Sequence, residues 1–355
     1  MIFSVIMAGG VGSRFWPMSR RARPKHLLPL VDGTPLIEAT IDRVSPITPK
    51  GNIRIVTNRF QYRRIKEALP WISDASFVLE PFGRNTAACI GLAAVHIRRI
   101  DPEAVMVVLP ADHIIENVAE FQKCLKQAVT IASQGRYLVT IGIPPTRVET
   151  GYGYIQRAKI CQGDPLICDV KTFAEKPNLS TAKRFIQSGD FYWNSGIFIW
   201  RVDEILKQFE KYLPDHYYQL NKISERLGHS DVSRYISKAY RSIRNISIDY
   251  GIMERAETVK MIEGRFGWGD IGSWEEAYRR SEKDKDGNAA VGESMFHQSV
   301  NCYVNSPKKF VAVVGMNDVI IVESSNALLV CNRAFAQEVK SVVEKLERQD
   351  IKRLL

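Results

Sequence analysis

Short apolar runs rich in β-branched residues alternate with amphipathic stretches through the first part of the chain. The apolar runs have the length of buried strands, and five strands are predicted, at 3–7, 53–57, 77–79, 105–109 and 138–143. The stretches between them predict helices near 35–44, 60–69, 86–99 and 118–133. This alternation predicts an α/β fold with a doubly wound, mostly parallel sheet. Ligands of such sheets bind beyond the carboxyl ends of the strands, so we expect the chemistry in the loops after residues 7, 79 and 109.

The pattern is mixed between residues 150 and 285. Strands are predicted at 170–174 and 196–200, and polar helices through 202–240. We interpret this segment as an insertion that forms a second wall over the sheet and supplies the substrate half of the same domain. The polar run at 281–288 is typical of a linker.

Strand-like pieces follow the linker, at 310–314, 318–322 and 327–331. A terminal helix is predicted from about 336 to 348. The predicted organisation is therefore one large domain over 1–285, with halves of about 1–145 and 146–285, and a small β-rich C-terminal domain over 289–355.

The composition is that of a folded protein, because 45% of the 355 residues are hydrophobic and 25% are charged. The formal charge of +10 would suit a nucleic acid, an acidic membrane surface or small polyanionic substrates. Lys and Arg occur in short clusters such as 20–23 and 59–66, with acidic residues interleaved elsewhere. This distribution favours a charged enzyme surface with local anion sites and no nucleic-acid partner.

No run approaches the roughly 18 apolar residues of a membrane span, and the first residues lack the basic segment of a secretion signal. We therefore expect a cytoplasmic protein without a membrane partner. Six cysteines are scattered without C-x-x-C spacing: Cys89, Cys124, Cys161, Cys168, Cys302 and Cys331. This spacing argues against a disulfide framework and a zinc site, so we expect reduced thiols that mostly fill the core.

The run that follows the first strand, residues 8–19, has three glycines within four positions. Backbone N–H groups there can approach phosphate oxygens without an intervening Cβ, although a tight connection is the alternative. The run lacks the Gly-Lys-Ser/Thr of a Walker A loop, and Phe15 stands where a dinucleotide fingerprint needs a small residue. Arg14 and Lys25 are the fixed-fork donor and the point charge that a triphosphate needs, although Lys25 could also be a solvated surface residue.

Asp112 follows the predicted strand 105–109 and should project from the carboxyl edge of the sheet. A carboxylate there can hold Mg²⁺ against phosphate oxygens, and the alternative is a cap for the helix near 117. Asp270 lies between Trp268 and Trp274, where a carboxylate beside bulky aromatic side chains needs a partner.

At this point the chain resembles the sugar-phosphate nucleotidyltransferases. The resemblance is carried by Gly9-Gly10-x-Gly12-x-Arg14 followed by Pro24-Lys25-x-Leu27-Leu28-Pro29-Leu30. Four further motifs, in order, are similar to the mannose-1-phosphate guanylyltransferase (GDP-mannose pyrophosphorylase) branch: 80–87, 110–113, 173–177 and 268–274. The resemblance implies a Rossmann-like nucleotidyltransferase fold, with 1–145 as the nucleotide half and 146–285 as the sugar-phosphate half.

The resemblance also implies a role for each motif residue. The nucleotide phosphates would be wrapped by Gly10, Gly12, Ser13 and Arg14, and Lys25 would meet the leaving pyrophosphate. Gly9 would also belong to the nucleotide-binding residues. The base would be bound by Gly83, Arg84, Asn85 and Thr86, of which Asn85 or Thr86 also suits the cap of the following helix. Asp112 and Asp270 would hold Mg²⁺, although a structural salt bridge is the alternative for Asp270.

For the sugar, the resemblance implies that Lys176 receives the phosphate and that Glu175 hydrogen-bonds the hydroxyl groups. Gly151 and Asn194 match further sugar contacts, but the Tyr- and Trp-rich segments around them are also typical of core. Arg14, Lys25 and Lys176 are therefore the expected catalytic residues. His113 is expected to be structural, because a sugar phosphate is already largely dianionic near neutral pH and needs no base.

The implied reaction is a single in-line displacement, in which mannose 1-phosphate attacks the α-phosphorus of GTP and pyrophosphate leaves. The alternatives are another sugar 1-phosphate or nucleotide, and a catalytically silent nucleotide-sugar sensor that keeps the fold. Many bacterial members carry a further cupin domain with isomerase activity, for which this sequence has no room, so isomerase activity is not expected. The tail from 289 indicates a contact in a homo-oligomer.

Overall fold

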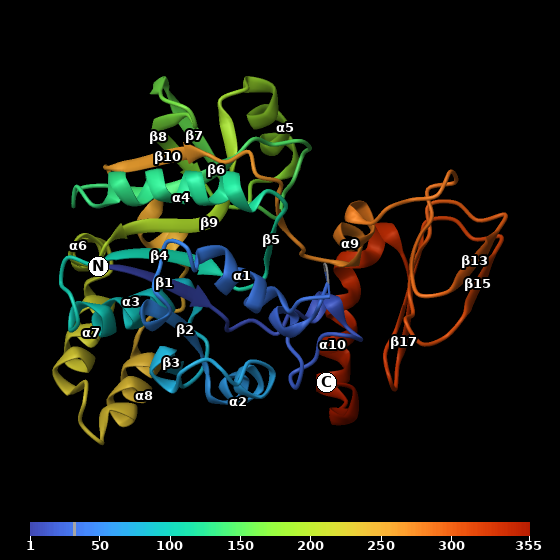
Figure 1. The fold of residues 1–355 in the computed structure, drawn as a ribbon, viewed down its shortest axis with the longest axis horizontal. Helices are drawn as coiled ribbons and strands as arrows, with labels where there is room; N and C mark the ends of the chain where they lie inside the picture. The colour runs from blue at the N-terminus through green and yellow to red at the C-terminus, as the bar shows by residue number, and fades with distance from the viewer. Residues whose placement is uncertain (31–32) are drawn as a thin grey trace. The chain divides into compact units, whose positions relative to one another are not determined.

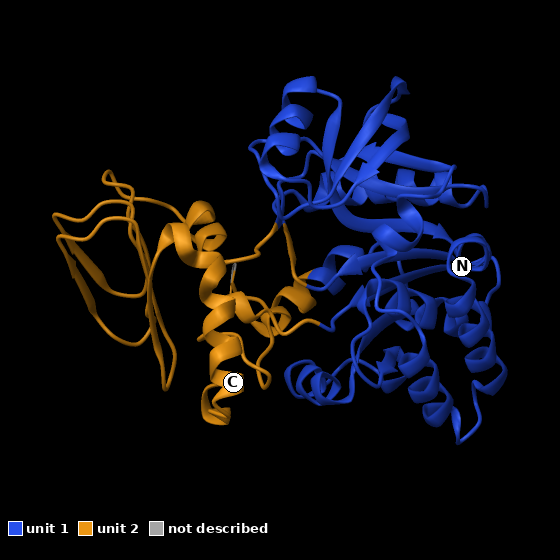
Figure 2. Cartoon of the chain, turned by 180° about the vertical axis from the view of Figure 1, so that it is seen from behind, with its two compact units in different colours: residues 1–9, 40–111, 115–269 blue, residues 10–39, 112–114, 270–355 orange. Residues whose placement is uncertain are grey.

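The computed structural model describes residues 1–30 and 33–355, and the chain divides into two compact units (Figure 2). Unit 1 comprises residues 1–9, 40–111 and 115–269, and unit 2 comprises residues 10–39, 112–114 and 270–355. None of the helices in these described residues is long and apolar enough to cross a membrane.

Unit 1 is built on a nine-stranded sheet (Figure 1). Its strands, in spatial order, are β3 (Phe77–Glu80), β2 (Ile53–Asn58), β1 (Ile2–Met7), β4 (Val105–Pro110), β9 (Phe191–Arg201), β6 (Leu138–Ile143), β10 (Val259–Glu263), β8 (Ile167–Ala174) and β7 (Tyr154–Gln162). Only β8 and β9 run against the others, since β3, β2, β1 and β4 pair in parallel, as do β6 and β10. The predicted α/β fold with a mostly parallel sheet is confirmed.

The central strands are continuous apolar runs because helices cover both of their faces. Met106 and Val108 of β4 belong to one buried cluster, which includes α3 (Asn85–Arg98), α6 (Val202–Tyr212), α7 (Pro214–Arg226) and α8 (Val232–Ser242). Val105, Val107 and Leu109 belong to a second cluster with α4 (Val118–Ala132). Successive side chains of a strand point to opposite faces, so β4 contributes side chains to both cores.

Asparagine side chains fix the starts of three helices in unit 1. Asn58 caps α2 (Arg59–Ala68), Asn117 caps α4 and Asn178 caps α5 (Leu179–Ser188), each by accepting from backbone N–H groups of the first turn. The cap of α4 is therefore Asn117, and the alternative of Asp112 as a cap near residue 117 is wrong.

The segment expected to form a second wall instead extends the main sheet. Its strands β7, β8 and β10 continue the order beyond β6, and β9 lies between β4 and β6. Strands β7 and β10 were not predicted. In β7 only Tyr154 and Ile155 are buried, so the rest of the strand gives little apolar pattern.

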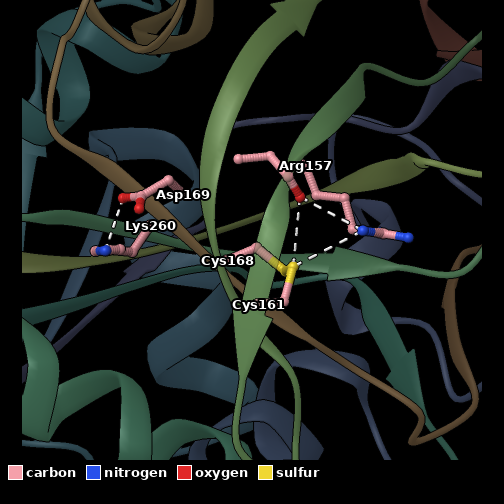
Figure 3. Close-up of a disulfide and its surroundings, with 6 residues drawn as sticks. Arg157, Cys161, Cys168, Asp169 and Lys260 are labelled. Carbon is pink, nitrogen blue, oxygen red and sulfur yellow. Dashed lines mark hydrogen bonds and ion pairs between the residues drawn. A yellow bond between two sulfur atoms is a disulfide. The ribbon is translucent and has the colours of Figure 1, made fainter.

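The hairpin of β7 and β8 also corrects the prediction for the cysteines (Figure 3). Cys161 and Cys168 form a disulfide, because the antiparallel register places them directly opposite each other with a Cα–Cα distance of 4.5 Å. The prediction of six reduced thiols is wrong for this pair, since their spacing reveals no pairing register. The remaining four are free, and Cys89, Cys124 and Cys302 are buried as expected.

The C-terminal part of unit 2 contains two small sheets. The first has the order β12 (Ala289–Val291), β14 (Tyr303–Asn305), β16 (Val319–Glu323) and β17 (Leu328–Asn332), and the second pairs β13 (Ser294–His297) with β15 (Val311–Val314). Parallel pairing of β12, β14 and β16, and of β13 with β15, makes the chain a short coil of stacked turns. The 3₁₀ turn Arg333–Glu338 and helix α10 (Val339–Arg348) follow it, which confirms the predicted β-rich C-terminal region.

The core of unit 2 mixes early and late parts of the sequence. Helix α9 (Trp274–Arg280) begins with a fully buried tryptophan whose ring meets Phe15 at 4.9 Å. The Trp274 indole N–H also donates to the Trp16 carbonyl at 3.0 Å. The run after β1 is thereby fixed to α9.

Candidate active site

Gly12 makes the tight turn of the glycine run possible. Its φ of 75° lies in the left-handed region, and a Cβ at this position would collide with the Cβ of Lys25. The Lys25 N–H donates to the Val11 carbonyl at 3.0 Å, which holds the two segments together. Ser13 and the exposed Arg14 then form a 3₁₀ turn with Phe15.

Lys25 is the centre of a charged cluster within unit 2. Only 4% of the residue is exposed, and its Nζ lies 2.7 Å from Asp112 Oδ2 and 3.0 Å from Asp270 Oδ1. Burial by itself would lower the pKa of Lys25, but the two carboxylates raise it above its ordinary value. Burial by itself would raise the pKa of Asp112, but the Lys25 ammonium holds it at about 2. Lys25 and Asp112 are therefore charged near neutral pH.

A second polar cluster lies in unit 1, beyond the end of β8. Glu175 accepts from the Lys176 ammonium at 2.6 Å, and Asn194 of β9 donates from its amide to Asp249 at 2.8 Å. The two pairs meet at Gly153, where a Cβ would collide with Glu175 and would lie 3.2 Å from the Asn194 Cβ. The structure thus brings Glu175, Lys176 and Asn194 together.

Asp249 and Gly153 belong to this cluster but were not predicted. Asp249 opens a π-helical turn over Asp249–Met253, a local geometry that often marks functional positions. Burial and the nearby charge of Glu175 raise the pKa of Asp249 to about 6. The only sequence signal was one acidic residue after the apolar Ile248. Gly151 is exposed, and its N–H donates to Glu149.

The predicted base-binding residues lie at the start of α3. Arg84 donates from Nε to the Tyr240 carbonyl at 2.7 Å, and its guanidinium lies over the Phe82 ring. Thr86 accepts from the Ile248 N–H at 2.8 Å, and Asn85, whose φ is 64°, accepts from the Thr86 N–H. Arg84 occupies the N-cap position without a side-chain cap, so the prediction of Asn85 or Thr86 as cap residue is wrong. Gly83 has open space around it.

Glu80, the last residue of β3, was also not predicted as a site residue. It is 5% exposed and accepts from the Tyr240 hydroxyl at 3.0 Å. Its other carboxylate oxygen lies 3.7 Å from the position of a Cβ on Gly9. Burial raises the pKa of Glu80 to about 7, so this carboxyl is poised between its two protonation states near neutral pH.

Comparison with known proteins gives the class that this fold and these clusters define. A family model described as nucleotidyl transferase matches residues 3–287, and one described as a mannose-phosphate isomerase/GMP-like β-helix domain matches residues 292–346. The chain belongs to the nucleotidyl transferase family, and it is an enzyme.

Relatives that match nearly the whole chain narrow the likeness. The chain is 36% identical, over 99% of its length and 75% of the relative, to a putative mannose-1-phosphate guanylyltransferase of Vibrio cholerae. It is 35% identical, over 98% of its length and 73% of the relative, to the mannose-1-phosphate guanylyltransferase of Escherichia coli K12. A crystal structure of a mannose-1-phosphate geranyltransferase from Thermus thermophilus superposes with a TM-score of 0.87 at 32% identity, covering 98% of this chain and 99% of that one.

Enzymes of this family generally use a divalent metal ion, and Asp112 and Asp270 fit one. Their carboxylate oxygens are hard ligands, and Mg²⁺ typically takes one or two carboxylates and completes its shell with water and substrate phosphates. Across residues 1–30 and 33–355, no group of three or more His, Cys, Asp or Glu side chains is placed to hold a metal ion. The pair therefore suits a cation that shares its ligands with a phosphate.

Proposed function

We propose that this enzyme transfers a guanylyl group from GTP to mannose 1-phosphate and releases GDP-mannose and pyrophosphate. The observation that carries the proposal is the charged cluster of Lys25, Asp112 and Asp270, which follows the glycine run and the β4 strand of a nucleotidyl transferase fold. The choice of guanine and mannose rests on the names of relatives that match 98–99% of the chain.

In this proposal unit 2 provides the groups that act on the nucleotide phosphates. Gly10, Gly12 and Ser13 would offer backbone N–H groups to phosphate oxygens, and Arg14 would donate a guanidinium. Asp112 and Asp270 would hold Mg²⁺, which when bound neutralises phosphate charge. Lys25 would stabilise the departing pyrophosphate, since phosphoryl transfer depends on positioning and on charge neutralisation.

Unit 1 would provide the contacts to the sugar and to the base. Lys176 would bind the phosphate of the sugar 1-phosphate. Glu175 would accept hydrogen bonds from sugar hydroxyl groups, and the Asn194 amide could donate to them or accept from them. Asp249 orients Asn194 through a 2.8 Å hydrogen bond and would complete this set. The run 83–86 and Gly9 would contact the nucleoside. The attacking phosphate oxygen is already an anion, so no general base is required.

The proposal is tested by ³¹P NMR of the purified protein with Mg²⁺, each of GTP, ATP, UTP and dTTP, and mannose, glucose and fucose 1-phosphates in turn. Diphosphodiester resonances and free pyrophosphate with GTP and mannose 1-phosphate alone are expected. Another productive pair would keep the mechanism and replace the substrate. Silence across the whole panel would overturn the proposal and favour a catalytically silent sensor.

A further inference from the structure

Lys25 occupies the position that a cation shared by Asp112 and Asp270 would need. A magnesium ion that bound one oxygen of each carboxylate would lie about 2.1 Å from both. The Lys25 ammonium lies 2.7 Å and 3.0 Å from one oxygen of each. A divalent cation bound to these same two oxygens could not share this space with the ammonium, and the like charges of the two cations would repel strongly at so short a distance.

The backbone and the stem of Lys25 are held in place by their neighbours. Its backbone is tied to Val11, its stem passes Gly12, and its Nζ lies 5.7 Å from the centre of the Phe15 ring. Only 6% of the side chain is exposed, so the ammonium would be costly to bury without its carboxylate partners. Asp112 and Asp270 would likewise repel each other without it.

We propose that Lys25 is the resident counter-ion of the two carboxylates, and that it exchanges with the divalent cation only when nucleotide phosphates take over the ammonium. The proposal rests on the proposed function, in which Asp112 and Asp270 are the metal ligands. Before exchange, one ammonium offsets two carboxylates. After exchange, the divalent cation offsets both carboxylates and the displaced ammonium pairs with phosphate.

The exchange has a consequence for the order of binding. A free divalent cation must displace Lys25 into a place without an anion, which opposes binding. When the cation arrives together with a triphosphate, the phosphate groups become the new partner of the displaced ammonium at the same moment. Cation and nucleotide should therefore each raise the affinity for the other, as two coupled ligands must.

The test measures Mn²⁺ binding in the absence of nucleotide, and electron paramagnetic resonance quantifies the free ion. Lys25→Met keeps the length of the side chain and removes its charge, and it is expected to bind Mn²⁺ at least about tenfold more tightly than the wild-type chain. The matched control is Lys211→Met, which removes a lysine paired with Glu257 at 2.9 Å on the surface and should bind like the wild type. An unchanged Mn²⁺ affinity in folded Lys25→Met would overturn the exchange.

Two further variants keep the outcome decisive. If Lys25→Met does not fold, Lys25→Gln, which is neutral but still donates hydrogen bonds, replaces it with the same expectation. Adding Asp112→Asn to either variant should abolish the gain in Mn²⁺ affinity. A gain that survives Asp112→Asn would place the metal elsewhere and refute the metal role assigned to Asp112 in the proposed function. The substrate panel tests transfer separately, so an active enzyme whose Lys25→Met variant shows no gain would lose the exchange alone.

Discussion

Gly12 shows how one residue can be fixed by both its backbone and its neighbour. Gly12→Ala places a Cβ at a φ of 75° and against the Lys25 side chain. We expect a loss of about 1–2 kcal/mol in the free energy of unfolding from the backbone alone, and a rise in KM for the nucleoside triphosphate as Lys25 shifts. Urea unfolding and initial-rate kinetics measure the two effects. Gly51→Ala is the control, since nothing lies within 4 Å of its Cβ position, and equal stability of both variants would contradict the argument.

Glu80 gives a pH dependence with a definite sign. Its pKa rises from 4.5 to about 7 on folding, chiefly by burial, so the folded state binds the proton more tightly than the unfolded state. The contribution of the protonated Glu80 carboxyl to the free energy of unfolding is complete below pH 4.5 and is lost as pH rises through 7. Glu80→Gln keeps the shape of the side chain without the charge. The difference in the free energy of unfolding between this variant and the wild type should therefore grow in favour of the variant by on the order of 3 kcal/mol from pH 4.5 to pH 8.

Urea unfolding at both pH values measures this difference. Glu225→Gln, which changes an exposed glutamate on α7, serves as the control and should show no such trend. A gain for Glu80→Gln that is the same at pH 4.5 and at pH 8 would show that the carboxyl is not held protonated in the fold.

The residues that could be predicted are those whose motif lies next to a recognisable element. The glycine run follows the first strand, and Asp112 follows the fourth, so the position of each along the sheet was evident from the sequence. Asp249 and Glu80 gain their environments from partners far along the chain, since Asn194 is 55 residues from Asp249 and Tyr240 is 160 residues from Glu80. No local pattern reports contacts of that kind.

Among the elements of unit 2, the segment that follows α10 is tied to the glycine run. The Arg20 guanidinium donates to the Pro17 and Arg353 carbonyls at 2.9 and 3.1 Å, and to the Ser324 hydroxyl at 3.1 Å. The Trp16 indole N–H donates to the Leu354 carbonyl at 2.9 Å. The sequence favours local anion sites at basic clusters such as 20–23, but the three acceptors of Arg20 are neutral groups of the chain itself.

Arg20→Met should therefore loosen the glycine run. We expect a loss of about 1–3 kcal/mol in the free energy of unfolding, because acceptors lose their donor, and a rise of about tenfold in KM for GTP. The control is Arg21→Met, because Arg21 is 62% exposed and its pair with Glu347 is worth little. If the two variants had the same KM for GTP, the brace would have no part in nucleotide binding.

The disulfide should act on stability and leave turnover alone. Cys161 and Cys168 are separated by seven positions, and a closed loop of that size predicts about 2 kcal/mol of stabilisation. The double change to serine should lower the free energy of unfolding by that amount and change kcat less than about twofold. Urea unfolding of the wild type under reducing conditions should give the same loss. A drop in kcat would instead tie the hairpin to the Glu175 cluster that follows β8.

Elements were predictable where one face or both faces of a segment are buried without interruption. The five strands predicted in the first part of the chain match β1, β2, β3, β4 and β6, with ends that agree to within one residue. The pairing of later strands was not predictable, because β9 takes its place between β4 and β6 through contacts between residues 50 or more positions apart. A pattern along the chain predicts that a strand exists, but it does not identify its neighbours.

At the scale of the whole molecule, sequence patterns offer only consecutive segments as domains. Unit 2 instead gathers residues 10–39, 112–114 and 270–355, and its buried cluster joins Phe15 and Leu28 to Trp274, Tyr303 and Ile320. The glycine run therefore shares a core with the C-terminal coil. No local signal predicted this, since the apolar residues between the glycine run and Leu30 have no regular spacing.

This shared core predicts the behaviour of a fragment that ends at residue 288. The fragment keeps every proposed catalytic residue, yet it removes Tyr303, Ile320 and Val322 from the cluster that buries Phe15 and Trp16. Each large side chain that loses its burial costs roughly 1.5–3 kcal/mol, so exposure of Phe15 and Trp16 should destabilise the glycine run. We expect turnover to fall by at least about a hundredfold, and we expect rapid proteolytic cleavage between residues 10 and 39.

Turnover and limited proteolysis of the fragment and of the full chain measure this prediction. The matched control is Val313→Ala in the full chain, because Val313 is buried in a separate cluster of the coil with Cys302, Val304 and Val319. That variant should lose about 1–3 kcal/mol of stability and keep its turnover, since its cavity lies outside the cluster around Phe15. A fragment as active as the full chain would mean that the glycine run holds its shape without the coil. In that case the Lys25 cluster and the loop before it would form one self-sufficient structure, and the coil would serve another purpose.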